Sequence, residues 1–263
     1  MDTFASLTNY YENYDEDARL GYRHGQPEFY TTVHYVERYL RPGMRILEIG
    51  AGTGRYSHYF ARAGYRVDAV ELIAHNIEIF RRNTLPGENV TVTEGNALDL
   101  AGFADDTYDI TLLLGPMYHL YSRTEQKRAL SEAIRVTKPG GVIFAAYCNN
   151  DMTVYQFCFG KGMMDDILAR QMIDPVTFET KSTPAEIFQL YRRENIDALM
   201  AGFDVTRLHY VGTDMLTRFL TETVDAMTDE QFAVYMRYHL SICERPDMTG
   251  LSNHMLDVFR KNG

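Results

Sequence analysis

The sequence has few cysteines, no long apolar run and a shortage of basic residues. Its three cysteines, Cys148, Cys158 and Cys243, are an odd number without a CxxC pair. That spacing excludes a disulfide framework and the usual zinc patterns. No apolar run comes close to the length of about 18 residues that a membrane-spanning helix needs. The first residues, MDTFA, lack a basic stretch followed by an apolar one, so we expect no signal peptide and predict a cytoplasmic protein without a membrane partner.

The charge balance is acidic, with 26 lysines and arginines against 36 aspartates and glutamates and a net charge of −10. A nucleic-acid partner is therefore disfavoured, because phosphate binding depends on basic side chains. Hydrophobic residues make up 45% and charged residues 24% of the 263 residues. These fractions exclude a disordered, collagen-like or coiled-coil chain, and the length allows one large domain or two small ones.

Apolar strand patterns alternate with helical patterns over the first 150 residues. The predicted strands are residues 44–49, 66–71, 90–94, 108–114 and 142–147. Helical spacing of apolar residues separates them, and Pro-Gly or glycine positions end most of the segments. This alternation predicts an α/β fold with a doubly wound, mostly parallel sheet. Residues 203–210 and 254–260 predict two later strands at the sheet edge, whereas residues 149–200 show helical spacing and no clear strand.

The strongest motif is a glycine loop that follows the first predicted strand. Gly50, Gly52 and Gly54 come at alternate positions, so the third glycine is one place too early for the dinucleotide fingerprint. Glu48, just before the loop, suits a ligand that carries an ammonium group. Glu71 ends the second strand, where a carboxylate can accept both ribose hydroxyls. Asn96 and the amide of Ala97 follow the third strand and can read an adenine edge, and together these groups describe S-adenosylmethionine better than NAD.

These motifs resemble the class I, Rossmann-like S-adenosylmethionine-dependent methyltransferases of the bacterial small-molecule type. The family's E/D-x-G-x-G-x-G maps onto Glu48 and the three glycines, its ribose-binding acid onto Glu71, and its adenine region onto Asn96 and Ala97. The resemblance also implies a seven-stranded sheet with a reversed final strand, and cofactor contacts from Ala51, Leu72 and Leu114. It covers residues 44–147 well. One departure is Asn96, where the family often has aspartate.

The resemblance further implies a division of the chain. Residues 43–148 and 201–263 form the cofactor-binding core, residues 1–42 an N-terminal helical lid, and residues 149–200 a helical insertion that caps the substrate pocket. Tyr14 and Arg19 of the lid are predicted to contact the cofactor and Tyr11 the substrate.

Tyr118 and His119 follow the fourth strand, beside the cofactor. We predict them as catalytic and substrate-contacting residues, since histidine titrates near neutral pH and can take a proton. A packing role for His119 is the alternative. No metal site is expected, because none of the histidines shows ligand spacing.

The predicted function is methyl transfer from S-adenosylmethionine to a small-molecule nucleophile, with S-adenosylhomocysteine as product and no metal. An RNA or protein methyltransferase, or a non-catalytic cofactor-binding partner subunit, remains an alternative. A dehydrogenase fits least, because of the glycine spacing. A monomer or a homodimer is expected.

Overall fold

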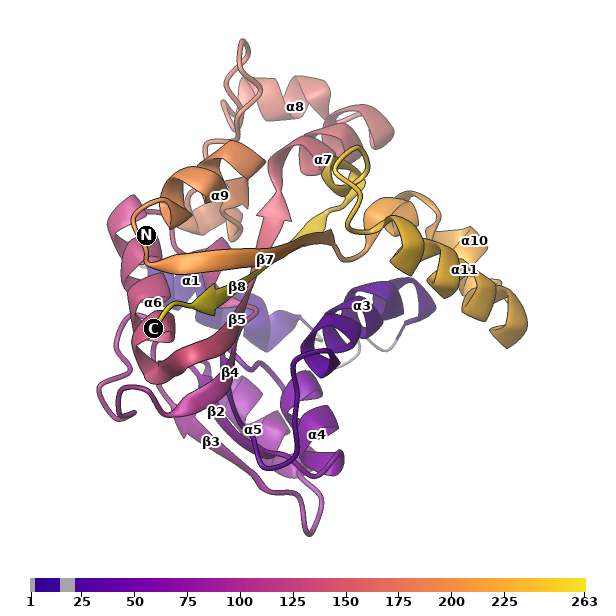
Figure 1. Cartoon of the computed structure of the whole chain (residues 1–263). Coiled ribbons are helices and arrows are strands. Elements are labelled where there is room, and N and C mark those ends of the chain that lie inside the picture. The colour runs from indigo at the N-terminus through magenta and orange to yellow at the C-terminus, as the bar shows by residue number, and fades with distance from the viewer. Residues whose placement is uncertain (1–2, 15–21) are drawn as a thin grey trace.

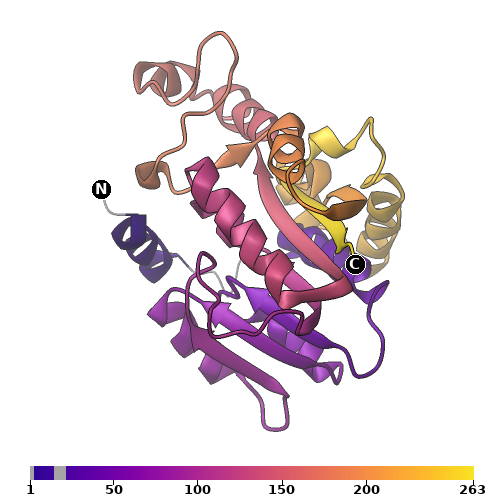
Figure 2. The same cartoon turned by 60° about the vertical axis from the view of Figure 1, so that its left-hand side comes forward.

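A computed structural model describes residues 3–14 and 22–263. Its centre is one mixed sheet, and Figures 1 and 2 show helices on both faces of it. The strands are β1 (Arg45–Ile49), β2 (Arg66–Glu71), β3 (Val90–Glu94), β4 (Tyr108–Leu113), β5 (Thr137–Asn149), β6 (Leu190–Tyr191), β7 (Val205–Gly212) and β8 (His254–Lys261). The longer helices are α1 (Thr3–Asn13), α3 (Gln26–Glu37), α4 (Arg55–Arg62), α5 (Ala74–Asn83), α6 (Arg123–Val136), α9 (Arg193–Met200) and α11 (Asp229–Ile242).

The strand order is β3-β2-β1-β4-β5-β8-β7, and β6 pairs with β5 beside this path. β1 to β5 are parallel, while β8 runs antiparallel to both β5 and β7. The doubly wound α/β class and the reversed final strand are thereby confirmed. The carboxyl ends of β1, β2 and β4 meet at one edge, which is where open sheets of this kind bind ligands.

The prediction of seven strands is wrong by one, because β6 lies inside the segment predicted to hold none. Its two residues pair in parallel with Cys148 and Asn149 at the end of β5. A two-residue strand is too short to show alternating hydrophobicity, so the sequence pattern could not reveal it. β5 is also longer at both ends than the predicted residues 142–147.

Two apolar clusters cover the two faces of the sheet. On one face, Phe29 and Val36 of α3 and Phe60 of α4 pack against β1, β4 and β8. On the other, Leu130 of α6 and Ile196 of α9 pack against the same strands. Helix α3 therefore belongs to the core. Among the described residues of 1–42, α1 and Tyr14 line the two cavities described below, and the lid over residues 1–42 stays a prediction.

Residues 150–192 form a cap above the carboxyl end of β5. It includes α7 (Asn150–Val154), a π-helical turn (Tyr155–Gly160), α8 (Met164–Ala169) and a 3-10 turn (Pro184–Glu186). Helix α1 touches both the 3-10 turn of the cap and α5 of the core. No helix in the described part of the chain is long and apolar enough to cross a membrane.

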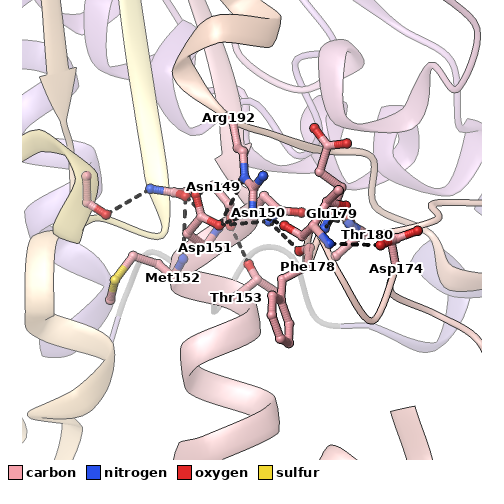
Figure 3. A network of polar contacts seen from close by, with 12 residues as sticks. Asn149, Asn150, Asp151, Met152, Thr153, Asp174, Phe178, Glu179, Thr180 and Arg192 are labelled. Atoms are coloured by element: carbon pink, nitrogen blue, oxygen red, sulfur yellow. Dashed lines mark hydrogen bonds and ion pairs between the residues drawn. The ribbon is translucent and has the colours of Figure 1, made fainter. Parts of the chain in front are cut away.

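A polar network anchors the cap to β5 (Figure 3). The side chain of Asn149 caps α7 by accepting from the backbone of Asp151, at 2.9 Å. Asn150 donates to the carbonyl of Phe178 and accepts from the amide of Thr180, so both sides of its amide hold the cap loop. Arg192 binds the carboxylate of Asp151 at 2.9 Å. These contacts thus fix the cap to the end of β5.

Candidate functional site

A cavity of about 410 Å³ lies at the carboxyl ends of β1, β2 and β4. We call it the glycine-loop cavity. Of the predicted cofactor residues it is lined by Glu48, Gly50, Ala51, Gly52, Glu71, Leu72, Asn96, Ala97 and Leu114. Further lining comes from positions without a strong sequence signal, namely Thr53, Ile73, Asn76, Gly95, Gly115 and Pro116. The topology brings these residues together because they lie at, or shortly after, the carboxyl ends of neighbouring strands.

Packing and backbone conformation explain why two positions of the loop, 50 and 54, require glycine. Gly50 has φ +75°, and a Cβ there would lie 2.6 Å from Cδ of Pro116. Gly54 has φ +91°, and a Cβ there would lie 2.5 Å from the ring of Phe80. Both contacts are too short for a side chain, and a positive φ already favours glycine. Gly54 does not line the cavity, so the structure assigns it to the packing of α4 and not to ligand contact.

Glu71 is the buried carboxylate at the end of β2. Its Oε2 accepts from the amide of Gly52 at 2.7 Å, and its Oε1 accepts from the amide of Ile73 at 2.9 Å. Burial raises the pKa of Glu71, while these hydrogen bonds oppose the shift. Oε1 also accepts from the side-chain amide of Asn76 at 3.4 Å, so Oε2 is the oxygen with a second lone pair for a ligand hydroxyl.

Glu48 is the most buried acid at this edge, with 1% of its surface exposed. It accepts a short hydrogen bond from the hydroxyl of Ser57. Burial raises its pKa to about 8, against the opposing effect of Ser57. A cationic group placed in the cavity would favour the charged carboxylate, because opposite charges stabilise each other most strongly where water is excluded.

Asn96 lines the same cavity, but its oxygen is partly engaged. Oδ1 accepts from the amide of Leu98 at 2.9 Å and closes a turn. The amide NH₂ remains as the group that can meet a ligand. Asn96 therefore offers a donor, whereas an aspartate in its place would offer only acceptors.

A second cavity of about 540 Å³ lies between α1 and the cap, and we call it the cap cavity. Tyr10, Phe157 and Phe188 form part of its aromatic wall, and Ile167 and Met172 of the cap add apolar surface. Tyr11 and Tyr118 line both cavities. The two cavities therefore adjoin at these two side chains.

His119 is held from both sides. Its Nδ1 lies 3.0 Å from the carbonyl oxygen of Ile187, and its Nε2 lies 2.8 Å from the hydroxyl of Tyr11. A carbonyl can only accept, so Nδ1 carries the proton and Nε2 accepts from Tyr11 in the neutral ring. Burial lowers the pKa of His119 to about 4, so the imidazole is neutral at physiological pH and its Nε2 lone pair accepts from Tyr11.

The carbonyl that orients His119 belongs to a strained turn. Ile187 has φ +67° and ψ −43°, and the amide of Phe188 donates to the carbonyl of Glu186 at 2.8 Å. This is a γ-turn of the rare, strained form, which is unusual for a β-branched residue. Tyr121 also donates to the carbonyl of Ile187. The turn thus connects the cap to the segment after β4, in which His119 lies.

The structure corrects two assignments and leaves one outside its reach. The hydroxyl of Tyr118 donates to the carbonyl of Leu114 at 2.5 Å, so it is directed at the backbone, and Tyr118 contributes its ring to the cavities. Tyr14, predicted to contact the cofactor, lines the cap cavity instead. Arg19 lies outside the described residues.

Sequence reasoning missed the residues at the start of β8. His254 and Asn253 line the cap cavity although they lie about 60 residues beyond the end of the cap in sequence. The Nδ1 of His254 lies 2.8 Å from Asp214 and 3.5 Å from Glu28. These three side chains are close enough together to hold a cation. They are joined here as an ion-pair cluster, and no spacing in the sequence could have revealed it.

Comparison with known proteins identifies the core. Residues 46–141 match the methyltransferase domain family. Residues 46–141 thus carry a methyltransferase domain, and the rest of the chain lies outside this match. The matched range begins in β1 and ends within β5, so it contains the glycine loop, Glu71, Asn96 and His119.

The curated relatives are similar over part of their length only. A demethylmenaquinone methyltransferase of Renibacterium salmoninarum is 36% identical over 40% of this chain and 41% of its own length. An S-adenosyl-L-methionine-dependent Diels-Alderase of Talaromyces variabilis is 32% identical over 39% of this chain and 35% of its own length. The chain therefore aligns with about two fifths of these relatives.

The fold extends further than the sequence similarity. A solved S-adenosylmethionine-dependent methyltransferase from Methanosarcina mazei superimposes with a TM-score of 0.59 and 18% identity, over 87% of this chain and 97% of its own. At this identity the likeness shows the fold alone. It agrees with the observed strand order and the mixed sheet.

Proposed function

We propose that this protein transfers a methyl group from S-adenosylmethionine to a small-molecule nucleophile. The observation that carries the proposal is the pair of cavities that share Tyr11 and Tyr118. One cavity has the groups that a cofactor of this kind needs, and the other is enclosed by the cap. Methyl transfer requires donor and acceptor to be held in line, with the reacting atoms about 3 to 3.5 Å apart.

The glycine-loop cavity fits the proposed cofactor by the chemistry of its donor set. Glu71 has a lone pair on Oε2 for a ribose hydroxyl, Glu48 is a buried partner for the ammonium group, and Asn96 offers a donor to the adenine. When bound, the cofactor supplies an activated methyl group on a sulfonium. The family match of residues 46–141 supports the same assignment.

His119 is the residue that we propose to handle a proton. Its Nε2 lone pair is directed at the Tyr11 hydroxyl, and the hydrogen bond to Ile187 maintains that tautomer. An acceptor hydroxyl or amine that displaces or joins Tyr11 would deliver its proton to Nε2. A base of this kind contributes about 10²- to 10⁴-fold in reactions that need proton removal.

Tyr118 has a different proposed role. Its hydroxyl is bound to the Leu114 carbonyl, so the ring is held between the two cavities. A tyrosine face next to a sulfonium stabilises the positive charge there. Tyr118 is thus proposed as a positioning residue between donor and acceptor.

The decisive experiment is calorimetric titration of S-adenosylmethionine, S-adenosylhomocysteine and NAD, followed by an assay for S-adenosylhomocysteine release. Binding of the first two without NAD, and product release with a small-molecule acceptor, is the expected result. Binding without turnover on any acceptor would favour a cofactor-binding subunit, or a reaction that leaves the methyl group in place. The Talaromyces relative, named a Diels-Alderase, makes that second outcome worth assaying.

A further inference from the structure

The cap cavity has a basic lining, although the whole chain carries a net charge of −10. Its acidic lining residue, Glu186, is already paired with Arg170 at 2.9 Å. Lys161 and Lys181 line the cavity and form no ion pair with any residue in the described ranges. The remaining basic lining residues are Arg218 and His254. A cavity lined in this way attracts anions more strongly than the rest of the surface does.

His254 is a charged donor that the fold has built into this cavity. Its Nδ1 lies between the carboxylates of Asp214 and Glu28, and Asp214 also accepts from the His254 backbone amide at 3.0 Å. These two carboxylates keep the ring protonated against the cost of burial. Because Nδ1 is taken, the second N–H, at Nε2, is the free donor. Within residues 3–14 and 22–263 it has no hydrogen-bond partner.

Asn253, next to His254, is a polar neighbour in the same cavity wall. The residue is 93% buried, since its exposed fraction is 7%, and it lines the cap cavity. Its NH₂ donates to Gln156 at 3.0 Å, while its Oδ1 is buried and has no partner in the described part of the chain. An amide oxygen can only accept, so this atom cannot bind an anion, and the recognition of an acid depends on His254.

We propose that the Nε2 N–H of His254 forms the binding point for a carboxylate of the substrate. The molecule methylated would then be an aromatic or apolar carboxylic acid, with its acid group at the start of β8. Its apolar part would lie along the wall formed by Phe157, Phe188 and Met172. The methyl-transfer part of this statement rests on the proposed function, but the recognition of the acid does not.

A carboxylate fits better than a phosphate because of the charges already present. Asp214 and Glu28 offset the positive charges of His254 and of Arg218, which lies 3.5 Å from Asp214. A doubly charged group would be repelled by these two fixed carboxylates. A singly charged carboxylate needs only the Nε2 hydrogen bond and the longer-range attraction of Lys161 and Lys181.

The test compares matched ligands on the wild-type protein. Calorimetric titration with 4-hydroxycinnamate and 2-naphthoate is set against their uncharged amides, 4-hydroxycinnamamide and 2-naphthamide, with and without S-adenosylhomocysteine. We expect each acid to bind about tenfold or more tightly than its amide, as a hydrogen bond to a charged group implies. Equal affinity of acid and amide, or no binding of either acid at millimolar concentration, would overturn the proposal. Tighter binding of phenyl phosphate than of the acids would overturn the choice of carboxylate.

Variants then assign the effect to named residues. His254→Asn keeps a donor for Asp214 but removes the Nε2 donor, and it is expected to abolish the preference for the acid. Lys161→Gln with Lys181→Gln should weaken acid binding a few-fold and reduce its salt dependence. Lys127→Gln, an exposed residue of α6 that lines neither cavity, is the matched control.

Loss of fold and failure of the cofactor assignment can both be distinguished from failure of this proposal. S-adenosylhomocysteine affinity and the thermal unfolding midpoint report on the glycine-loop cavity and on folding in each variant. If that ligand does not bind while the acid preference persists, the proposed function fails and the acid site stands. If S-adenosylhomocysteine binds and the acid preference is absent, the acid site fails and the cofactor assignment stands.

Discussion

The hydroxyl oxygen of Tyr11 lies 2.8 Å from Nε2 of His119, and this hydrogen bond joins helix α1 to the segment after β4. The two residues are 108 positions apart in sequence. The contact lies where the glycine-loop cavity adjoins the cap cavity, both of which Tyr11 lines. Helix α1 thereby places a hydroxyl where an acceptor must approach the proposed base.

The first prediction concerns this pair. His119→Asn retains a side-chain N–H for the Ile187 carbonyl but has no acceptor in place of Nε2. We expect kcat for methyl transfer to fall by about 10²-fold or more, with cofactor affinity within a few-fold of wild type. Tyr118→Phe is the comparison, because it removes a hydroxyl already bound to the backbone, and kcat should change by less than about tenfold. Single-turnover rates measure both, and equal losses in the two variants would contradict the proposed base.

The second prediction tests Glu71 as the ribose partner. Glu71→Gln should weaken S-adenosylhomocysteine binding by about 10- to 100-fold, because one strong acceptor is replaced by a donor. Glu94→Gln is the matched control, since Glu94 pairs in register with Glu71 at the end of β3 but is exposed and lines neither cavity. Calorimetry on both variants decides the matter. The assignment fails if the two substitutions weaken binding equally.

The third prediction is that cofactor binding releases protons from Glu48. Burial raises the pKa of Glu48 to about 8, so the carboxyl is mostly protonated near pH 6.5. An ammonium group bound beside it would lower that pKa and expel the proton. Titrations at pH 6.5 in buffers of different ionisation enthalpy should show proton release, and Glu48→Gln should lose it. Unchanged release in that variant would assign the proton to another group.

The fourth prediction concerns the stability contributed by the Asp214–His254 ion pair. The carboxylates of Glu28 and Asp214 raise the pKa of His254 to about 10 against the effect of burial, above its ordinary 6.5. A raised pKa means that this stabilisation is fully present below pH 6.5 and is lost as pH rises toward 10. The free energy of unfolding of the wild type, minus that of His254→Asn, should therefore decline across that range. Urea denaturation at several pH values measures the difference, and a constant or growing difference would contradict the assignment.

The fifth prediction concerns the stability that His119 contributes at low pH. Burial lowers its pKa to about 4, so the folded state prefers the neutral ring. Stability from this residue is present above pH 6.5 and declines as pH falls toward 4. Replacing His119 by asparagine should flatten the acid limb of the stability curve, measured in the same denaturation series.

The sequence by itself determined the sheet core and the glycine-loop cavity. Apolar strands, glycine positions and strand-end acids are local signals, because a strand buried on both faces and a tight turn each constrain their own residues. Glu48, Glu71 and the loop before α4 were therefore predictable. Gly54 was assigned to the cofactor only because the motif was considered without the ring of Phe80 that packs on it.

Only the tertiary structure decided what surrounds the second cavity. The γ-turn at Ile187, the contact from Tyr11 to His119 and the cluster of Glu28, Asp214 and His254 join segments far apart in the chain. None has a periodic or motif signal, since their geometry arises when α1, the cap and β8 meet at the ends of β4 and β5. Chain folding, and not local propensity, thus sets which groups can reach the substrate.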